Sequence, residues 1–176
     1  MNMRYFVTVV LFIASMTGAK AKNNISVDYT EESELVSVIA HLAKVPGYIW
    51  PEEQAGVIDY FHQVDSTFAP YSNHPIMAFV ADSLVKQGFG YHVPVAIALR
   101  LKLKNGKLHY NTDLEPDFNH YYRGITPQHE KKLIALLEDF YKKAHFHSFF
   151  KKNQPLYNAC KQAMQQQLVD KIDLDW

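Results

Sequence analysis

The sequence predicts one mainly α-helical domain of about six helices with a small β-hairpin, preceded by an export signal. Apolar residues recur at spacings of three and four along most of the chain, and short turns rich in proline or glycine separate these segments. One Asn-Gly pair interrupts an alternating apolar pattern, as in a hairpin. Helices joined by short turns pack as antiparallel neighbours. We therefore expect a single compact domain over residues 22–176.

Residues 1–21 have the three parts of a signal peptide. Arg4 precedes an apolar run over residues 5–14, and Ala19 and Ala21 are small residues at the two positions that a signal peptidase reads. The run is too short to remain in a bilayer as a spanning helix. Removal of residues 1–21 from the 176-residue chain leaves 155 residues, the size of one domain. We expect an exported protein, periplasmic or extracellular, with no transmembrane segment after cleavage.

The mature chain is nearly neutral. Arg4 and Lys20 leave with the signal, so 16 of the 18 basic residues remain beside 18 acidic ones. This balance argues against binding to nucleic acid or to an anionic membrane. Cys160 is the single cysteine, so an exported chain of this kind has no internal disulfide.

Two helices are predicted in the first part of the domain, after residues 22–29, which form either a mobile start or a short edge strand. Thr30 is a suitable cap for the first helix, with acidic residues in its first turn. Pro46 and Gly47 end that helix. The second helix begins at residues 51–53 and stops at Pro70. The apolar stripes of the two helices are Leu35, Val38, Ile39, Leu42 and Val45, and then Val57, Ile58, Phe61, Val64 and Phe68.

A third helix is predicted from His74-Pro75 to Gly88, because proline suits the first helical position. Residues 92–104 fit both a helix and a strand. We predict a helix to about Ala98 and then a hairpin, since Asn105-Gly106 favours a two-residue turn with a returning strand over residues 107–110.

Two further helices are predicted near the C-terminus. Thr126-Pro127 opens the first, which extends to Ala144. Pro155 is expected to start the last one, and its inward face is Leu156, Cys160, Ala163, Met164 and Leu168. The alternation over residues 172–176 suggests either a truncated chain or a terminal strand.

Three patterns resemble metal sites, and we interpret each as structural. His129-Glu130 lacks a second histidine one turn later, since Leu133 stands there, so Glu130 serves the helix dipole. His145 and His147 would lie on nearly opposite sides of a helix. The loop over residues 113–124 has oxygen-bearing side chains at alternate positions, but Phe118 replaces the turn glycine of a calcium loop. No metal or other cofactor is expected in this chain.

Asp65, Tyr71 and His74 are the first candidates for a site. A helix end, a tight turn and a new helix start would bring them together, and a histidine beside a carboxylate is a common acid–base pair. The structural interpretation is favoured, in which His74 caps a helix, Asp65 faces water and Tyr71 covers the core. Cys160 on an apolar helix face is expected to be an inert thiol.

The loop before the fifth helix supplies a second candidate site. Tyr121, Tyr122 and Arg123 combine aromatic rings with a cation in a chain whose aromatic content is 14%. Such side chains at a surface loop suit sugar or peptide ligands.

The residues around the second helix carry a family resemblance. The motifs are Ser33-Glu34-Leu35-Val36, Tyr60-Phe61, Val64-Asp65, Phe68-Ala69-Pro70-Tyr71 and His74-Pro75. Over most of residues 25–170, their order resembles the N-terminal half of a family of exported bacterial proteins catalogued as a domain of unknown function. The resemblance implies a relation to metallopeptidases, since longer members look like HExxH enzymes. This chain lacks that zinc motif, so no catalytic residue is carried over.

Three functions follow as hypotheses. The first is the non-catalytic N-terminal portion of an exported metallopeptidase-like protein, whose partner would be a C-terminal peptidase-like half holding zinc. The second is a self-sufficient binding module of the cell envelope for peptide or sugar. The third is a small hydrolase that uses Asp65 and His74.

Overall fold

The chain folds into a mainly helical domain with a small antiparallel hairpin, as the sequence predicts. The structure, a computed structural model, describes residues 12–13, 26–49, 58–110 and 124–167. Its helices are α1 (Glu31–Leu42), α2 (Ile58–Phe68), α3 (Pro75–Ala78), α4 (Val93–Leu99), α5 (Pro127–Lys143) and α6 (Phe146–Gln167). Its strands are β1 (Phe12–Ile13), β2 (Ser26–Val27), β3 (Leu101–Lys104) and β4 (Lys107–Tyr110).

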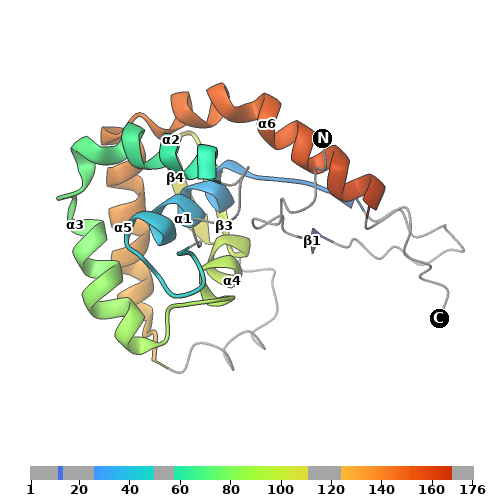
Figure 1. Cartoon of the computed structure of the whole chain (residues 1–176). Coiled ribbons are helices and arrows are strands. Elements are labelled where there is room, and N and C mark those ends of the chain that lie inside the picture. Colours follow the sequence, from blue (N-terminus) through green and yellow to red (C-terminus); the bar gives the residue numbers. More distant parts are fainter. Residues whose placement is uncertain (1–11, 14–25, 50–57, 111–123, 168–176) are drawn as a thin grey trace, which may run out of the picture.

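Helix α1 is the centre of the fold. It contacts α3, α4, α5, α6 and β3, and α6 crosses over the top of this group in Figure 1. Its apolar stripe is almost inaccessible to water, with Leu35 1% exposed and Ile39 2% exposed. Burial of the helix on several sides at once explains why the chain needs no cross-link to hold its core together.

The predicted helix starts at Thr30, His74-Pro75 and Thr126 are confirmed. The Thr30 hydroxyl accepts a hydrogen bond from the amide of Ser33, and Thr126 forms a reciprocal capping box with His129. Helix α1 ends slightly earlier than predicted, because Lys44 adopts a left-handed φ of 54° ahead of Pro46. The predicted start of α2 at residues 51–53 lies outside the described residues.

The third predicted helix is a composite. A 3₁₀ turn, Ala69–Tyr71, follows α2, and α3 continues directly into a π-helical segment, Phe79–Leu84, and a second 3₁₀ turn, Val85–Gln87. Gly88 then ends the helical path with a φ of 90°. Residues at this position need a left-handed backbone, which glycine adopts without steric cost.

The hairpin after α4 is confirmed in position and register. Leu103 pairs with Leu108, and Lys104 pairs with Lys107 across a two-residue turn. Both turn residues have positive φ, 53° at Asn105 and 70° at Gly106, as a type I′ turn requires. A separate pair joins β2 to β1, which lies within the predicted signal peptide.

The prediction for the last helix is wrong in its start and its inward face. Helix α6 begins at Phe146, nine residues before Pro155, because Phe146, Phe149 and Phe150 have helical spacing and are all buried. His145, with a φ of 50°, makes the break from α5. After Pro155, the side chains expected to face inward are no more than partly buried where they are described: Leu156, Cys160, Ala163 and Met164.

Within the described segments, no helix has the length and apolar character that crossing a membrane requires.

Candidate functional site

The structure divides the predicted trio of Asp65, Tyr71 and His74 between different partners. The Asp65 carboxylate lies 2.9 Å from Nε2 of His41, on α1, and is half exposed. The His74 ring instead contacts Asp139, on α5, at 3.0 Å. Tyr71 is packed edge-on against Phe140, with ring centroids 6.0 Å apart. The two acid–histidine pairs therefore belong to separate places, and the expected Asp65–His74 pair is not formed.

His74 is a helix cap, as the structural interpretation predicts. Its Nδ1 accepts a hydrogen bond from the amide of Ile76 at 3.3 Å, so Nε2 must carry the proton that it donates to Asp139. The side chain is 5% exposed and rests against the edge of Phe140. Because both ring nitrogens are engaged, His74 is held in one tautomer and serves structure.

His41, on α1, makes a comparable pair with Asp65, on α2. Its Nδ1 lies 3.3 Å from the carbonyl oxygen of Tyr48, its Nε2 faces Asp65, and the ring stacks on Phe61 with centroids 4.3 Å apart. Both polar partners are acceptors, so the two hydrogen bonds exist together when both ring nitrogens carry protons. The sequence patterns did not single out His41, since its partners are distant in sequence.

A part-buried carboxyl lies among tyrosine hydroxyls where α1, α2 and α6 meet. Glu34, on α1, accepts a hydrogen bond from the hydroxyl of Tyr60, on α2, and that hydroxyl lies 2.9 Å from the hydroxyl of Tyr157, on α6. Tyr29 packs on Tyr157 at 5.3 Å and donates to Asn158. We call Glu34, Tyr60 and Tyr157, together with Tyr29, the Glu34 cluster.

Burial controls the electrostatics of the Glu34 cluster. It raises the pKa of the Glu34 carboxyl, and the hydrogen bonds from Tyr60 and Tyr157 offset part of this shift. Burial, with the nearby Glu34 charge, also raises the pKa of both tyrosine hydroxyls well above the ordinary value. The tyrosines are therefore neutral hydrogen-bond donors, and Glu34, with its pKa raised above the ordinary value, is the acid of the cluster.

Glu34 could have been suspected from its position. It precedes Val38 by one helical turn, which places an acid beside the apolar stripe of α1. Its tyrosine partners could not be read from the sequence, because they are 26 and 123 residues away.

Glu31 forms a separate polar contact at the start of α1. It accepts a hydrogen bond from the Tyr141 hydroxyl at 3.0 Å and lies 2.9 Å from Nδ1 of His147. His147 is thus engaged by a carboxylate. His145 is the left-handed residue that separates α5 from α6. Within the described segments, no group of three or more histidine, cysteine or acidic side chains could hold a metal ion.

The Cys160 thiol is half-buried on α6 near the Glu34 cluster. Burial, and then the charge of Glu34, raise its pKa. A raised pKa lowers the thiolate fraction, which is the nucleophilic form, so this thiol is poorly suited to nucleophilic chemistry.

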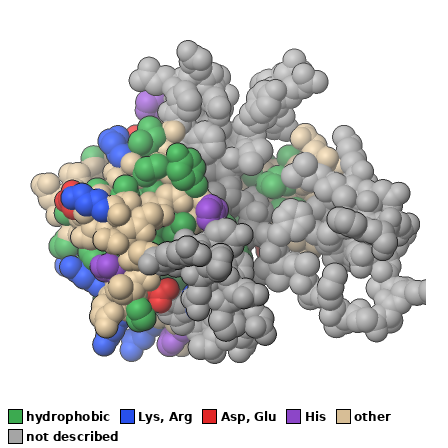
Figure 2. Space-filling view, turned by 90° about the horizontal axis from the view of Figure 1, so that it is seen from below, with side chains coloured by type: hydrophobic (Ala, Val, Ile, Leu, Met, Phe, Trp, Pro, Cys, Tyr) green, Lys and Arg blue, Asp and Glu red, His purple; other side chains and the backbone are tan. Residues whose placement is uncertain are grey.

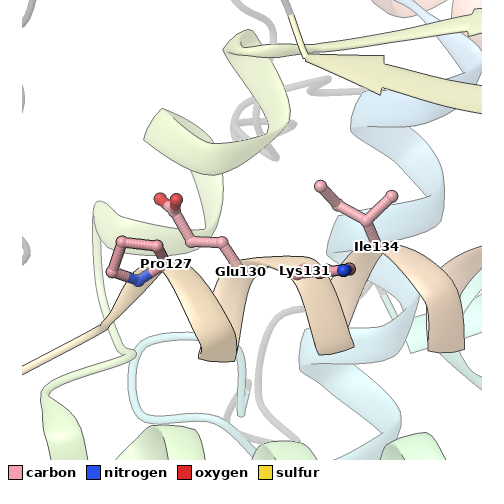
Figure 3. Close-up of a pocket in the computed structure, with 4 residues that line it drawn as sticks. All are labelled: Pro127, Glu130, Lys131 and Ile134. Carbon is pink, nitrogen blue, oxygen red and sulfur yellow. The ribbon is translucent and has the colours of Figure 1, made fainter.

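An open depression of about 300 Å³ lies along the first turns of α5. Pro127, Glu130, Lys131 and Ile134 line it, and Figure 3 shows Glu130 and Ile134 pointing to the same side of the helix. Glu130 is 20% exposed and lies 3.9 Å from Arg100 at the end of α4. This separation exceeds a direct hydrogen bond, so the Glu130 carboxylate retains capacity to accept one.

The second predicted site precedes this depression in the chain. Tyr121, Tyr122 and Arg123 lie outside the described residues, as does the acidic loop over residues 113–119. Arg123 is four positions before Pro127, the first residue of α5 that lines the depression.

Charge does not gather on the face of the molecule shown in Figure 2. Lysine and arginine side chains are scattered around its coloured part, between apolar and neutral surface. This distribution agrees with the balance of 18 basic and 18 acidic residues in the whole chain.

No protein-family model, curated protein or solved structure matches this chain.

Proposed function

We propose that this protein is an exported, non-catalytic binding module that holds a short extended peptide in the depression at the start of α5. The observation that carries the proposal is the depression itself, which combines two apolar side chains with a carboxylate and an amine. Ligand sites of proteins have this composition, with apolar walls and a few polar groups that fix orientation.

The shape of the depression favours a peptide over an enclosed small molecule. It lies open along one helix, whereas pockets for small ligands bury most of the ligand surface. Pro127 and Ile134 are seven residues apart, which is about 10 Å along a helix. An extended peptide rises about 3.3 Å per residue, so roughly three of its residues cover this distance.

The charges indicate which peptide would bind. Glu130 is the less exposed of the two charged residues and stands between Pro127 and Ile134. A lysine or arginine in the middle of the peptide would pair with it, and apolar neighbours would contact the proline ring and the isoleucine. We therefore propose a ligand with the pattern apolar–basic–apolar.

The histidines support a binding role over the small-hydrolase hypothesis. Both ring nitrogens of His74 and of His41 are engaged by partners within the fold. A general base needs a free nitrogen within hydrogen-bond reach of the substrate. In this arrangement, His74, the base of that hypothesis, offers none unless a structural hydrogen bond is first broken.

Fluorescence polarisation with labelled pentapeptides tests the proposal. We expect a Leu-Lys-Leu core to bind more tightly than a Leu-Glu-Leu core, and Glu130→Gln and Ile134→Ser each to weaken binding by about tenfold. Asp59→Asn and Ile49→Ser are the matched controls, since both side chains are exposed and neither lines the depression. Equal affinity for the two cores, or a loss that the controls reproduce, contradicts the proposal.

A soluble oligosaccharide series belongs in the same experiment, because aromatic side chains also suit sugars. Binding of a sugar with no peptide binding would show that the ligand class is wrong while the module remains a binding protein.

An accessory role beside a peptidase-like half stays a second proposal, motivated by the resemblance in residues 33–75. If this accessory role is right, an HExxH protein encoded beside or downstream of this chain co-purifies with the chain. The Ile134→Ser variant should then weaken cleavage of an apolar–basic–apolar peptide by that protein. A neighbouring HExxH protein that neither binds this chain nor responds to it would remove the motive for this role.

A further inference from the structure

Helix α6 consists of two halves with different packing. The first half buries Phe146, Phe149 and Phe150 in the core. The second half, residues 156–167, has no fully buried side chain, and it extends past the body of the domain in Figure 1. Pro155 separates the halves and provides no amide for the helical hydrogen bond to Lys151. A proline inside a helix is a natural point of bending.

Polar contacts hold much of the second half. The hydroxyl of Tyr29 donates to Asn158 at 2.9 Å, and Gln165 accepts from the amide of Val27 at 2.9 Å. Lys161 pairs with Asp28 at 3.0 Å. The innermost contact is made by Tyr157, which reaches the Glu34 carboxyl and the Tyr60 hydroxyl. This half is therefore attached through these polar contacts and through the packing of the Tyr157 ring on Tyr29 and Phe150.

Glu34 is the titratable group at the centre of this attachment. Tyr60 from α2, and Tyr157 and Cys160 from α6, face the Glu34 carboxyl. The neighbouring segment before α1 contributes Tyr29 and Asp28. On α1 itself, Glu31 is turned to Tyr141 and His147. Among the described residues, no lysine, arginine or histidine neutralises the Glu34 carboxyl.

We propose that residues 156–167 form a proton-controlled latch, in which Pro155 is the hinge and the protonation state of Glu34 decides how tightly the latch is closed. A protonated Glu34 is a neutral group that fits between two tyrosine hydroxyls. An ionised Glu34 is a carboxylate without a counter-ion, and water solvates it better when the second half of α6 moves away. Opening also exposes the ring faces of Tyr29, Phe150 and Tyr157, which now pack on one another.

The direction of the pH dependence follows from linkage. Burial raises the pKa of Glu34 above the ordinary value of 4.5, so a closed latch, which supplies part of that burial, binds the proton more tightly than an open one. The closed latch is most stable below about pH 4.5 and loosens as the pH rises through the raised pKa. The Asp28–Lys161 pair acts in the opposite direction, since the pKa of Asp28 is lowered and the pair is lost in acid below about 3.8.

Hydrogen exchange followed by mass spectrometry tests the latch. The full chain is labelled between about pH 4 and about pH 8, and the protection of residues 156–167, corrected for intrinsic exchange, is divided by that of residues 146–154. We expect this ratio to fall as the pH rises, by up to about tenfold for each pH unit in the transition.

Two acid-to-amide variants identify the titrating group. Glu34→Gln keeps an acceptor for the tyrosines and removes the charge, so its protection ratio should become independent of pH above about 4.5. Glu138→Gln is the matched control on α5, and it should retain the wild-type response. A wild-type ratio that does not change with pH, or a response that persists in Glu34→Gln, overturns the proposal.

A substitution of Pro155 tests whether this residue is the hinge. Pro155→Ala restores an amide to the helix, so the second half should be protected at all pH values by joining the cooperative unit of the first half. If Pro155→Ala leaves the pH response of residues 156–167 unchanged, Pro155 is not the hinge.

Discussion

Nε2 of His74 lies 3.0 Å from Oδ2 of Asp139, and this contact ties the cap of α3 to the exposed side of α5. Lys143 reinforces it from the next turn, at 2.9 Å from the same oxygen. The hydrogen bond from Lys143, followed by that from His74, holds the pKa of Asp139 below its usual value. One histidine thus completes a helix start and connects α3 to α5 through a contact between residues that are 65 positions apart in the chain.

Replacement of His74 should separate these two roles. His74→Ala removes the cap and the contact to Asp139, and should lower the free energy of unfolding by about 1–2 kcal/mol. His74→Asn retains a good capping residue, so it should recover much of that loss. Urea denaturation monitored by circular dichroism provides both values. Equal stability of wild type and His74→Ala would contradict the assignment of His74 as a cap.

Two glutamates accept hydrogen bonds from outward-facing amides of the hairpin between α4 and α5. Glu138 accepts a hydrogen bond from the amide of Leu108 at 2.7 Å. Glu32 accepts one from the amide of Leu103, the residue paired with Leu108. Together they occupy outward amides on both strands of a two-stranded sheet, which would otherwise be open to pairing with another chain.

Loss of the Glu138 carboxylate should therefore destabilise the hairpin. Glu138→Ala leaves the amide of Leu108 without its acceptor and should cost about 1–3 kcal/mol of stability. Glu138→Gln keeps an acceptor oxygen and should cost less. Hydrogen exchange at Leu108 distinguishes the effect from a general loss, because its protection should fall before that of α1. A loss of stability with unchanged protection at Leu108 would place the role of Glu138 elsewhere.

Gly124 marks a close approach between two backbones. A Cβ atom at this position would meet the carbonyl oxygen of Gln87, at the end of the helical path from α3. Gly124→Ala should therefore lower stability by about 1–3 kcal/mol through a clash with backbone, which cannot rotate away.

Gly88→Ala is the informative comparison for Gly124→Ala. Gly88 has a φ of 90° and open space around its Cα, so alanine there is strained without a clash. We expect the loss at Gly124 to be the larger of the two in thermal unfolding. A neutral Gly124→Ala variant would show that the two segments move apart at little cost.

The features that were best predicted from the sequence are the helix caps and the hairpin turn, which depend on local interactions. The caps at Thr30 and Thr126 and the turn at Asn105-Gly106 depend on residues a few positions apart, and the structure confirms them. Prediction from the sequence was wrong where the burial of apolar side chains outweighed a local helix signal. Pro155 is a strong helix start, yet the three buried phenylalanines before it extend the helix through it.

The polar pairs were beyond the reach of sequence patterns for a related reason. His41 meets Asp65 across 24 residues, and Tyr60 meets Tyr157 across 97. No spacing rule connects positions so far apart in the sequence. The prediction of a site near Asp65 and His74 grouped these residues by nearness in the chain, whereas the structure pairs Asp65 with His41 and His74 with Asp139.

The global stability of the protein should depend on pH through Glu34. Because burial raises the pKa of Glu34, the native state binds its proton more tightly than the unfolded chain, whose glutamate titrates near 4.5. Ionisation of Glu34 therefore lowers stability progressively as the pH rises above about 4.5. Glu34→Gln escapes this loss, so the difference in Tm between the variant and wild type should grow in favour of the variant from about pH 4.5 to neutrality. Differential scanning calorimetry measures it directly. A difference that is constant over this range would mean that Glu34 has the same pKa in both states, and that its carboxyl is solvated in the folded protein.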